Sequence, residues 1–459
     1  MSLPYLRTVV LAGCVAANAC SPEADGHAAD PAASARIDAI LSKTFAPDAP
    51  GAAVIAIQGG KVVFRRAYGL ANLETRTAMR PEMVFEIGSL TKQFTSTAVL
   101  MLAEQGKVSL TDDVRKYLPE FPDKGAVITV EHLLTHTSGI KSYTDDPQWL
   151  GMWRQDLTPA QVIDLTRDAP LEFPPGTKWN YNNTGYTMLG AIIEKASGVP
   201  YAEFVRRHIF EPVGMSQSLY GSASAVIPHR ASGYTRGATG WENAPYLSMT
   251  QPYAAGALMS SVDDLMRWDE AVSSGRLMSK ASWARAFTGF KLSGGEDTQY
   301  GYGWQLGTYQ GRHLVHHSGG IPGYASAAVR MPSDRIYVVV LTNSDDPPAE
   351  LDFIAVRIGD ELTGNAYREP PTTLLPIAVL DAYVGLYRIN ESATRTITRE
   401  GTRMFMQRTG GQKLEITASA EGEFFVRGSS RRLSFLKDNS GRITGLVMDH
   451  LGWREAAER

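Results

Sequence analysis

The order of strand-like and helix-like segments is the feature that most limits how this chain of 459 residues can fold. Residues 52–57 and 61–68 are β-rich and flank Gly59-Gly60, which is the pattern of a hairpin. Further strand-like runs follow at 303–306, 313–316, 324–331 and 336–343. The stretch between about 119 and 279 alternates helical segments with long loops. We therefore expect an α/β body over residues 35–363, with a sheet built from both ends of the segment and a helical insertion between them.

Apolar spacing predicts the helices of this body. One begins near Arg36, with Ile37, Ile40 and Leu41 on its apolar side. A second begins at Ser89 and stops near Gly106. The others are expected at 130–134, 159–167, 186–196, 201–209 and 348–362.

The pattern changes after Thr363. Residues 364–379 contain Pro370-Pro371 and Pro376 and are typical of a linker. Residues 380–459 then give seven short alternating strands, at 385–389, 395–399, 403–407, 413–417, 423–426, 432–437 and 443–449. Regular short strands separated by turns indicate a small antiparallel barrel or sandwich, which we expect to form a separate C-terminal domain.

The first 20 residues have the pattern of a secretory leader, with one positive charge at Arg7 followed by a short apolar run. Leu11-Ala12-Gly13-Cys14 resembles a lipoprotein processing site, and Ala17-Asn18-Ala19 before Cys20 suits either signal peptidase. The alternative is an ordinary cleaved signal peptide. Residues 21–34 are expected to be a flexible tether. The sequence thus predicts a protein of the bacterial cell envelope, either periplasmic or anchored to the membrane as a lipoprotein.

Charge and cysteine content exclude several function classes. Lysine plus arginine total 45 and aspartate plus glutamate total 48, for a net charge of −3, so a basic nucleic-acid surface is not supported. Cys14 and Cys20 are the only cysteines, so the body has no disulfide framework, cysteine zinc site or cysteine nucleophile. No G-x-S-x-G, H-E-x-x-H or phosphate-loop motif occurs, and Leu133 stands between His132 and His136 where a metalloprotease needs glutamate. We expect no metal and no cofactor.

The strongest chemical signal is Ser89-Leu90-Thr91-Lys92 at the start of the predicted helix. The i, i+3 spacing places Lys92 on the same face as Ser89. A partly desolvated lysine has a lowered pKa and can accept the serine proton, which makes Ser89 a nucleophile. The competing interpretation is that Ser89 simply caps the helix, because serine is common at that position.

Two further segments could complete a cleft. Tyr181 and Asn183 are separated by one residue, so a phenol and a carboxamide could face the same space, although a polar turn before a helix would look alike. His317-Ser318-Gly319-Gly320 follows a predicted strand, and its small residues would let a substrate backbone lie along the sheet. A His316–His317 metal pair is disfavoured because neighbours on a strand point to opposite faces.

The order S-x-x-K, Y-x-N and H-S-G resembles the penicillin-recognising serine hydrolases, which include class C β-lactamases, D-alanyl-D-alanine carboxypeptidases, D-aminopeptidases and esterases of the same fold. The resemblance extends to the surroundings at 85–89, 132–139, 186–190 and 256–265, and covers roughly residues 36 to 360. It implies a β-lactamase/transpeptidase-like body with an antiparallel sheet and a helical subdomain. The segment at 380–459 resembles the lipocalin-like domain found on many such hydrolases, which implies a barrel.

The resemblance also implies roles for these residues. Ser89 would be the acylated nucleophile, Lys92 its base, and Tyr181 the residue that passes a proton to the leaving group. Asn183 would bind the substrate side chain. The segment His317, Ser318, Gly319 and Gly320 would line the substrate site, with the backbone N–H groups of Ser89 and Gly320 forming an oxyanion hole. His136 would be scaffold near the cleft.

One departure from the family pattern bears on the substrate. His317 stands where β-lactamases usually have lysine, and histidine is mostly neutral at pH 7, so efficient β-lactam hydrolysis is not expected. The expected substrates are D-amino-acid peptides and amides or small carboxylic esters, with weak β-lactam hydrolysis as a minor activity. The alternative function is a catalytically silent penicillin-binding or sensing protein with the same fold.

Overall fold

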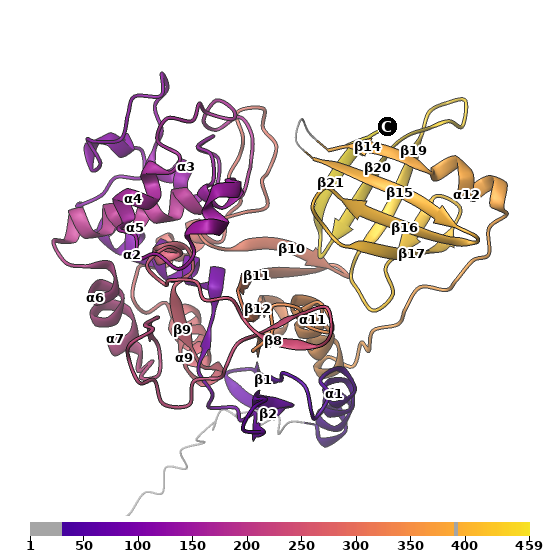
Figure 1. The fold of residues 1–459 in the computed structure, drawn as a ribbon, viewed down its shortest axis with the longest axis horizontal. Coiled ribbons are helices and arrows are strands. Elements are labelled where there is room, and N and C mark those ends of the chain that lie inside the picture. Colours follow the sequence, from indigo (N-terminus) through magenta and orange to yellow (C-terminus); the bar gives the residue numbers. More distant parts are fainter. Residues whose placement is uncertain (1–29, 390–392) are drawn as a thin grey trace, which may run out of the picture.

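The computed structural model describes residues 30–389 and 393–459. A helical region, a central sheet and a C-terminal barrel follow one another across the molecule (Figure 1). The predicted leader, with Cys14 and Cys20, and most of the predicted tether lie outside the described residues. Within the described ranges, no helix combines the length and the apolar character needed to cross a membrane.

The central sheet has six antiparallel strands in the order β10-β11-β12-β13-β1-β2. Strand β1 lies between β2 and β13, so segments nearly 300 residues apart in sequence are hydrogen-bonded neighbours, Ala52 being paired with Thr342. This confirms the prediction of a sheet built from both ends of the body. The strands are β1 (Ala52–Gln58), β2 (Lys61–Tyr68), β10 (Gln305–Tyr309), β11 (Arg312–Ile321), β12 (Tyr324–Met331) and β13 (Ile336–Thr342).

Both faces of the sheet are covered, which explains why β1 is apolar at nearly every position. Val54 and its same-face neighbours pack in a core with α1 (Pro31–Thr44) and α11 (Leu351–Leu362). Ile55, on the opposite face, belongs to the larger core formed with the helical region. The catalytic candidates lie on that second side of the sheet.

Helix α1 begins at Pro31, five residues before the predicted start near Arg36. Asp30 accepts hydrogen bonds from the backbone N–H groups of Ala32 and Ala33, and Pro31 occupies the first helical turn, where it loses no hydrogen bond. The last residues assigned to the tether are therefore helical.

The helical region confirms the predicted helices with shifted ends. The helix predicted at 186–196 starts three residues earlier, so Asn183 is its first residue and does not lie in a loop; Asn182 caps it. The helix predicted from Ser89 is preceded by a 3-10 turn, η1 (Gly88–Leu90). The α-helices of this region are α2 (Thr91–Glu104), α3 (Val130–Leu134), α4 (Pro159–Asp164), α5 (Asn183–Ser197), α6 (Tyr201–Val205), α7 (Glu211–Val213), α8 (Tyr253–Gly256), α9 (Val262–Ser274) and α10 (Lys280–Ala286).

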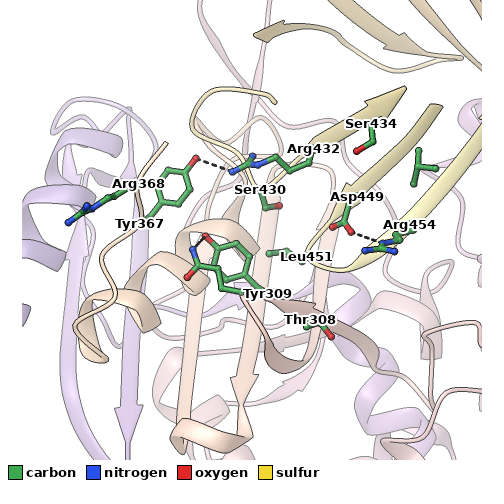
Figure 2. Close-up of a pocket in the computed structure, with 12 residues that line it drawn as sticks. Thr308, Tyr309, Tyr367, Arg368, Ser430, Arg432, Ser434, Asp449, Leu451 and Arg454 are labelled. Atoms are coloured by element: carbon green, nitrogen blue, oxygen red, sulfur yellow. Dashed lines mark hydrogen bonds and ion pairs between the residues drawn. The ribbon is translucent and has the colours of Figure 1, made fainter. Parts of the chain in front are cut away.

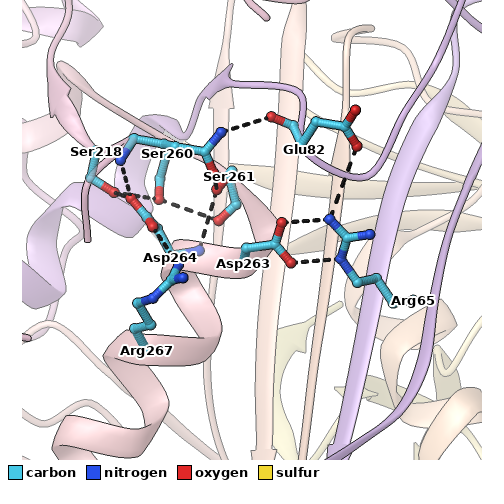
Figure 3. Close-up of polar contacts among 9 residues, drawn as sticks. Arg65, Glu82, Ser218, Ser260, Ser261, Asp263, Asp264 and Arg267 are labelled. Atoms are coloured by element: carbon cyan, nitrogen blue, oxygen red, sulfur yellow. Dashed lines mark hydrogen bonds and ion pairs between the residues drawn. The ribbon is translucent and has the colours of Figure 1, made fainter. Parts of the chain in front are cut away.

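Helix α9 is fixed to the sheet through polar contacts at its first turn (Figure 3). Ser261 caps it by accepting the backbone N–H of Asp264. Asp263 accepts two hydrogen bonds of 2.7 Å from Arg65 of β2, and the buried Asp264 accepts one from the Ser218 hydroxyl. Both aspartates thus stabilise the first turn of α9, where a negative charge is favourable.

The C-terminal domain is a closed barrel of eight antiparallel strands, which decides between the predicted barrel and sandwich. Its interior is filled by side chains such as Phe424, Phe435 and Met404. The short helix α12 (Ile377–Tyr383) precedes it. The strands are β14 (Gly385–Arg388), β15 (Thr394–Glu400), β16 (Arg403–Arg408), β17 (Lys413–Ala420), β18 (Glu423–Phe425), β19 (Arg432–Lys437), β20 (Ile443–His450) and β21 (Trp453–Glu458).

Strand β21 was not predicted because its buried positions carry no large apolar side chain. They are Glu455, which pairs with the buried Arg395 of β15, and the small Ala457.

The barrel contacts the body at the edge strand β10 (Figure 2). The backbone N–H of Thr308 donates to the carbonyl of Leu451 at 2.9 Å, and the Gln299 carboxamide donates to the carbonyl of Gly452 at 2.9 Å. Beside this contact Tyr367 of the linker accepts a hydrogen bond from Arg432 of β19. The turn between β20 and β21 is thereby held against the body.

Candidate active site

Ser89 lies on the η1 turn between strand β5 (Phe85–Glu86) and helix α2. The turn requires Gly88, whose φ is +51° and where a Cβ would come within 2.9 Å of the backbone nitrogen of Gly320. The Ser89 hydroxyl caps neither η1 nor α2, which removes the competing interpretation of Ser89 as a structural cap. Its hydrogen-bond partner is Lys92 Nζ at 3.1 Å.

Lys92 is fully buried, with 0% of its surface exposed. Its Nζ lies 2.8 Å from Asn183 Oδ1 and 2.8 Å from the carbonyl oxygen of Ala255, in addition to the Ser89 hydroxyl. No carboxylate is among these partners, and burial holds the pKa of Lys92 well below its usual value.

The partners of Lys92 determine the direction of each hydrogen bond in its neutral form. A neutral amine has two N–H donors and one lone pair. The Asn183 and Ala255 oxygens can only accept, so they take both N–H groups. The lone pair is left for the Ser89 hydroxyl, which is then the donor. The geometry therefore presents the base to the proton that it has to remove.

Tyr181 lies over this pair, with Lys92 Nζ 4.8 Å from the centre of its ring. Its hydroxyl is buried without a hydrogen-bond partner within the described residues. Burial raises the pKa of Tyr181, and the neighbouring Ser89 hydroxyl opposes that rise in pKa. Tyr181 is therefore a neutral phenol at pH 7, with a hydroxyl free to bond to a reacting group.

Asn183 is held on three sides. Its backbone N–H donates to Ser142 Oγ at 3.1 Å, its side-chain NH2 donates to Thr144 Oγ1 at 3.2 Å, and its carbonyl oxygen accepts from Lys92. These contacts orient the carboxamide toward the lysine. That Asn183 also binds substrate stays a prediction.

The sequence indicated that His317-Ser318-Gly319-Gly320 follows the strand, whereas in the structure these residues lie within strand β11. Glycine is needed at position 319 because the strand passes close to the Ser89 turn there, and a Cβ would overlap the Ile87 carbonyl oxygen. Ser318 and Gly320 are exposed beside Ser89, while His317 is buried. The oxyanion hole formed by Ser89 and Gly320 N–H groups stays a prediction.

Both nitrogens of His317 are engaged. Nδ1 lies 2.6 Å from the Ser318 carbonyl oxygen and Nε2 lies 2.9 Å from the Tyr300 hydroxyl. The carbonyl can only accept, so Nδ1 carries the proton and Tyr300 donates to Nε2. Burial, with a further contribution from Lys92, lowers the pKa of His317 to about 3. The histidine is neutral and is not a substitute for a lysine cation.

A cleft of about 400 Å³ opens in front of Ser89. Among the described residues that line the cleft, the titratable side chains are the neutral His317 and the phenols of Tyr181 and Tyr300. Aromatic rings form much of the wall, and one of them, Trp453, comes from the barrel. The lining residues are Ser89, Trp179, Tyr181, Thr298, Gln299, Tyr300, Gln305, His317, Ser318, Gly320 and Trp453.

The contributors to the site that sequence reasoning missed include the Ala255 carbonyl, Tyr300 and Trp453. None belongs to a recognisable motif, and each reaches the site from a segment distant from Ser89. The sequence feature that could have drawn attention to this region is the clustering of tyrosine and tryptophan at 179–186 and 300–304.

His132 and His136, which have metal-ligand spacing in the sequence, make other contacts in the structure. His132 completes a capping box at the start of α3, with Nδ1 accepting the Thr129 N–H, and is not paired with His136 as a ligand. Elsewhere Glu350, Asp352 and His450 bring ligand atoms within 4.8 Å of one another. There His450 is already bonded to Asp352 at 3.0 Å and to Ser430 at 2.6 Å.

A serine facing a buried lysine one helical turn away, beside an antiparallel sheet with a helical subdomain, defines the class of β-lactamase/transpeptidase-fold serine hydrolases. The comparison with known families agrees: the family model described as Beta-lactamase matches residues 37–362. The chain belongs to this family. Its similar proteins include a D-aminopeptidase, and the structure of a D-amino acid amidase from Ochrobactrum anthropi shares its fold.

Individual relatives extend the likeness. Penicillin-binding protein 4* of Bacillus subtilis (strain 168) is 31% identical over 406 residues, covering 83% of this chain and 89% of the relative. The D-aminopeptidase of Gluconobacter oxydans (strain 621H) is 29% identical over 350 residues, covering 74% and 65%. The octameric penicillin-binding protein homologue from Pyrococcus abyssi superposes with a TM-score of 0.66 at 29% identity, covering 93% of this chain and 99% of that structure.

Proposed function

We propose that this protein is a serine hydrolase that works through a covalent acyl-enzyme at Ser89. The observation that carries the proposal is the environment of Lys92, whose two N–H groups are taken by the Asn183 and Ala255 oxygens, so that its lone pair faces the Ser89 hydroxyl. Its lowered pKa keeps the amine available as a base at neutral pH.

The proposed reaction has two halves. In the first, Lys92 takes the Ser89 proton while Oγ forms a bond to the substrate carbonyl carbon, and Tyr181 passes a proton to the leaving alcohol or amine as its bond to that carbon breaks. In the second, water attacks the acyl carbon and gives a proton to the Tyr181 oxygen, the bond to Oγ breaks, and Lys92 returns its proton to Oγ. The products are a carboxylic acid and free Ser89.

The lining of the cleft indicates which substrates it suits. A peptide C-terminus or a β-lactam carries a carboxylate, and none of the described residues that line the cleft has a cationic side chain to pair with it. Trp179, Tyr300 and Trp453 instead offer apolar aromatic surface. We therefore propose small carboxylic esters and amides of D-amino acids with apolar side chains, which carry no carboxylate, as substrates ahead of D,D-peptides and β-lactams.

The similar proteins support a hydrolase that acts on D-amino acid compounds, because a D-aminopeptidase is among them. EstCE1, described as a hydrolase with promiscuous acyltransferase activity, shares the fold. We further propose that the protein works in the cell envelope, as its N-terminal residues predict, and as a lipoprotein if Cys14 or Cys20 is acylated. Membrane fractionation of the full chain beside Cys14→Ala and Cys20→Ala variants would test the anchor.

The central test maps the covalent intermediate. A fluorophosphonate is incubated with the protein and the adduct is located by mass spectrometry. We expect the label on Ser89, its loss in Ser89→Ala, and its persistence in Ser318→Ala, which removes the other serine in the cleft. Label that survives in Ser89→Ala would eliminate the mechanism.

A substrate panel then tests the specificity. It combines p-nitrophenyl acetate and phenylacetate, D-phenylalanine amide, a D-Ala-D-Ala peptide and nitrocefin. We expect turnover of the two p-nitrophenyl esters and D-phenylalanine amide, which have no carboxylate, to exceed that of the D-Ala-D-Ala peptide and nitrocefin. An adduct at Ser89 without turnover of any substrate would instead support the catalytically silent alternative.

A further inference from the structure

His136 holds the chain on both sides of Tyr181. Its backbone carbonyl accepts the N–H of Asn180 at 3.0 Å, and its ring nitrogen Nδ1 accepts the N–H of Asn182 at 3.0 Å. Tyr181 is the single residue between these two hydrogen bonds. The ring centres of His136 and Tyr181 are also 4.4 Å apart, so the same side chain supports the phenol from one side.

The backbone of His136 is itself unusual. Its φ is +60°, a left-handed conformation that is unfavourable for a side-chain-bearing residue. The residue is 1% exposed and follows the last turn of α3. In this conformation one residue can direct both its carbonyl and its ring toward the 180–182 segment.

The hydrogen bond at Nδ1 also determines the form of the ring. Nδ1 accepts a backbone N–H, so it cannot carry a proton, and the neutral ring must hold its proton on Nε2. Nε2 is buried without a hydrogen-bond partner within the described residues, among the rings of Tyr181, Tyr186 and Tyr300. Burial lowers the pKa of His136, and the nearby Lys92 and His317 lower that pKa further.

We infer that His136 is a positioning residue that fixes the Tyr181 hydroxyl over Ser89 and Lys92, through its Nδ1 hydrogen bond to Asn182 and its ring contact with Tyr181. The inference rests on the proposed function, because it assigns Tyr181 a role in proton transfer. It goes beyond that function by giving His136 a task in the reaction distinct from holding the fold.

Three substitutions of His136 distinguish the effect of its Nδ1 hydrogen bond on activity from the effect of the volume of its ring. In His136→Asn, Oδ1 stands where Nδ1 stood and can accept the Asn182 N–H, and asparagine tolerates positive φ. His136→Leu keeps a branched side chain without an acceptor. His136→Gly tolerates the same φ without strain and also lacks the acceptor, so it serves if the leucine variant fails to fold.

We expect His136→Leu and His136→Gly to lower kcat for an ethyl ester, whose leaving alkoxide must be protonated, about tenfold or more while changing KM by less than about threefold, because a displaced general acid affects the chemical step and not ground-state binding. We expect His136→Asn to keep kcat within about threefold of the wild type. Melting temperatures measured alongside identify a merely structural effect. Equal losses of kcat in all three variants, in step with their melting temperatures, would overturn the inference.

Nitrogen-15 NMR of the histidine rings gives an independent readout. We expect His136 in the wild type to be the neutral tautomer with its proton on Nε2 at pH 7, and a ring with its proton on Nδ1 would contradict the inference. Failure of the proposed function is distinguishable, because it would appear as a wild type without Ser89-dependent turnover. A fully active wild type together with unchanged kcat in the leucine and glycine variants would contradict the inference about His136 and leave the proposed function standing.

Discussion

At the scale of single residues, the chemistry of the cleft depends on what surrounds one amine. Lys92 has carbonyl oxygens as neighbours and no carboxylate, so nothing compensates the cost of burying its charge. The lowered pKa that results is a condition for a lysine base at neutral pH. An acidic residue at position 183 would favour the charged form of Lys92 and so weaken it as a base at neutral pH.

The variant Asn183→Asp tests this dependence. The rate of Ser89 labelling in the wild type should rise with pH as Lys92 loses its proton and level off well below pH 10.5, since the pKa of Lys92 is lowered. A carboxylate at 183 favours the protonated amine, so the midpoint should move to higher pH, by about one unit or more, and labelling at pH 7 should fall about tenfold or more.

Thr144→Val is the matched control, because it removes the Thr144 partner of the Asn183 side-chain NH2 without adding charge. Its midpoint should stay at the wild-type pH. A midpoint that moves to lower pH in Asn183→Asp would contradict the assignment of Lys92 as the titrating base.

At the scale of elements, the site depends on how closely strand β11 approaches the η1 turn. The predicted end of this strand at His316 was wrong, because the glycines that follow permit contact between two backbones and do not end the strand. By contrast, the helix α2, the hairpin β1–β2 and seven of the barrel strands follow local patterns and were predicted from them.

Gly319→Ala should destabilise the body by about 1–3 kcal/mol, because its methyl group would overlap the Ile87 carbonyl and force β11 away from Ser89. Gly320→Ala is the control for stability, since a Cβ there would meet no atom within 4 Å. Urea denaturation of both variants measures the difference. Equal free energies of unfolding for the two variants would show that the close contact at Gly319 is not needed.

At the scale of the whole molecule, the barrel takes part in the cleft. The turn at Leu451 and Gly452 is hydrogen-bonded to β10 and to Gln299, and the next residue, Trp453, lines the cleft opposite the body. Its ring centre lies 6.4 Å from that of Trp179. The C-terminal domain therefore contributes to the surface that meets the substrate.

Trp453→Ala should raise KM for p-nitrophenyl phenylacetate about tenfold, the equivalent of ~1.4 kcal/mol, and change KM for the acetate much less, because only the larger acyl group reaches the indole. Trp241→Ala, which removes a tryptophan outside the cleft, is the matched control. The ratio of the two KM values checks the prediction, and an unchanged ratio in Trp453→Ala would assign the indole to domain contact alone.

The sequence alone determined what depends on neighbours along the chain: the serine and lysine one turn apart, the alternation of the barrel strands, and the two ends of the body that had to pair as a sheet. Tertiary structure decided the rest. Ala255, Asn183 and Trp453 approach the Ser89 turn from segments between about 90 and 360 residues away. Such contacts depend on packing between distant elements, and because no periodic pattern records that packing, only the folded chain shows which groups meet Ser89 and Lys92.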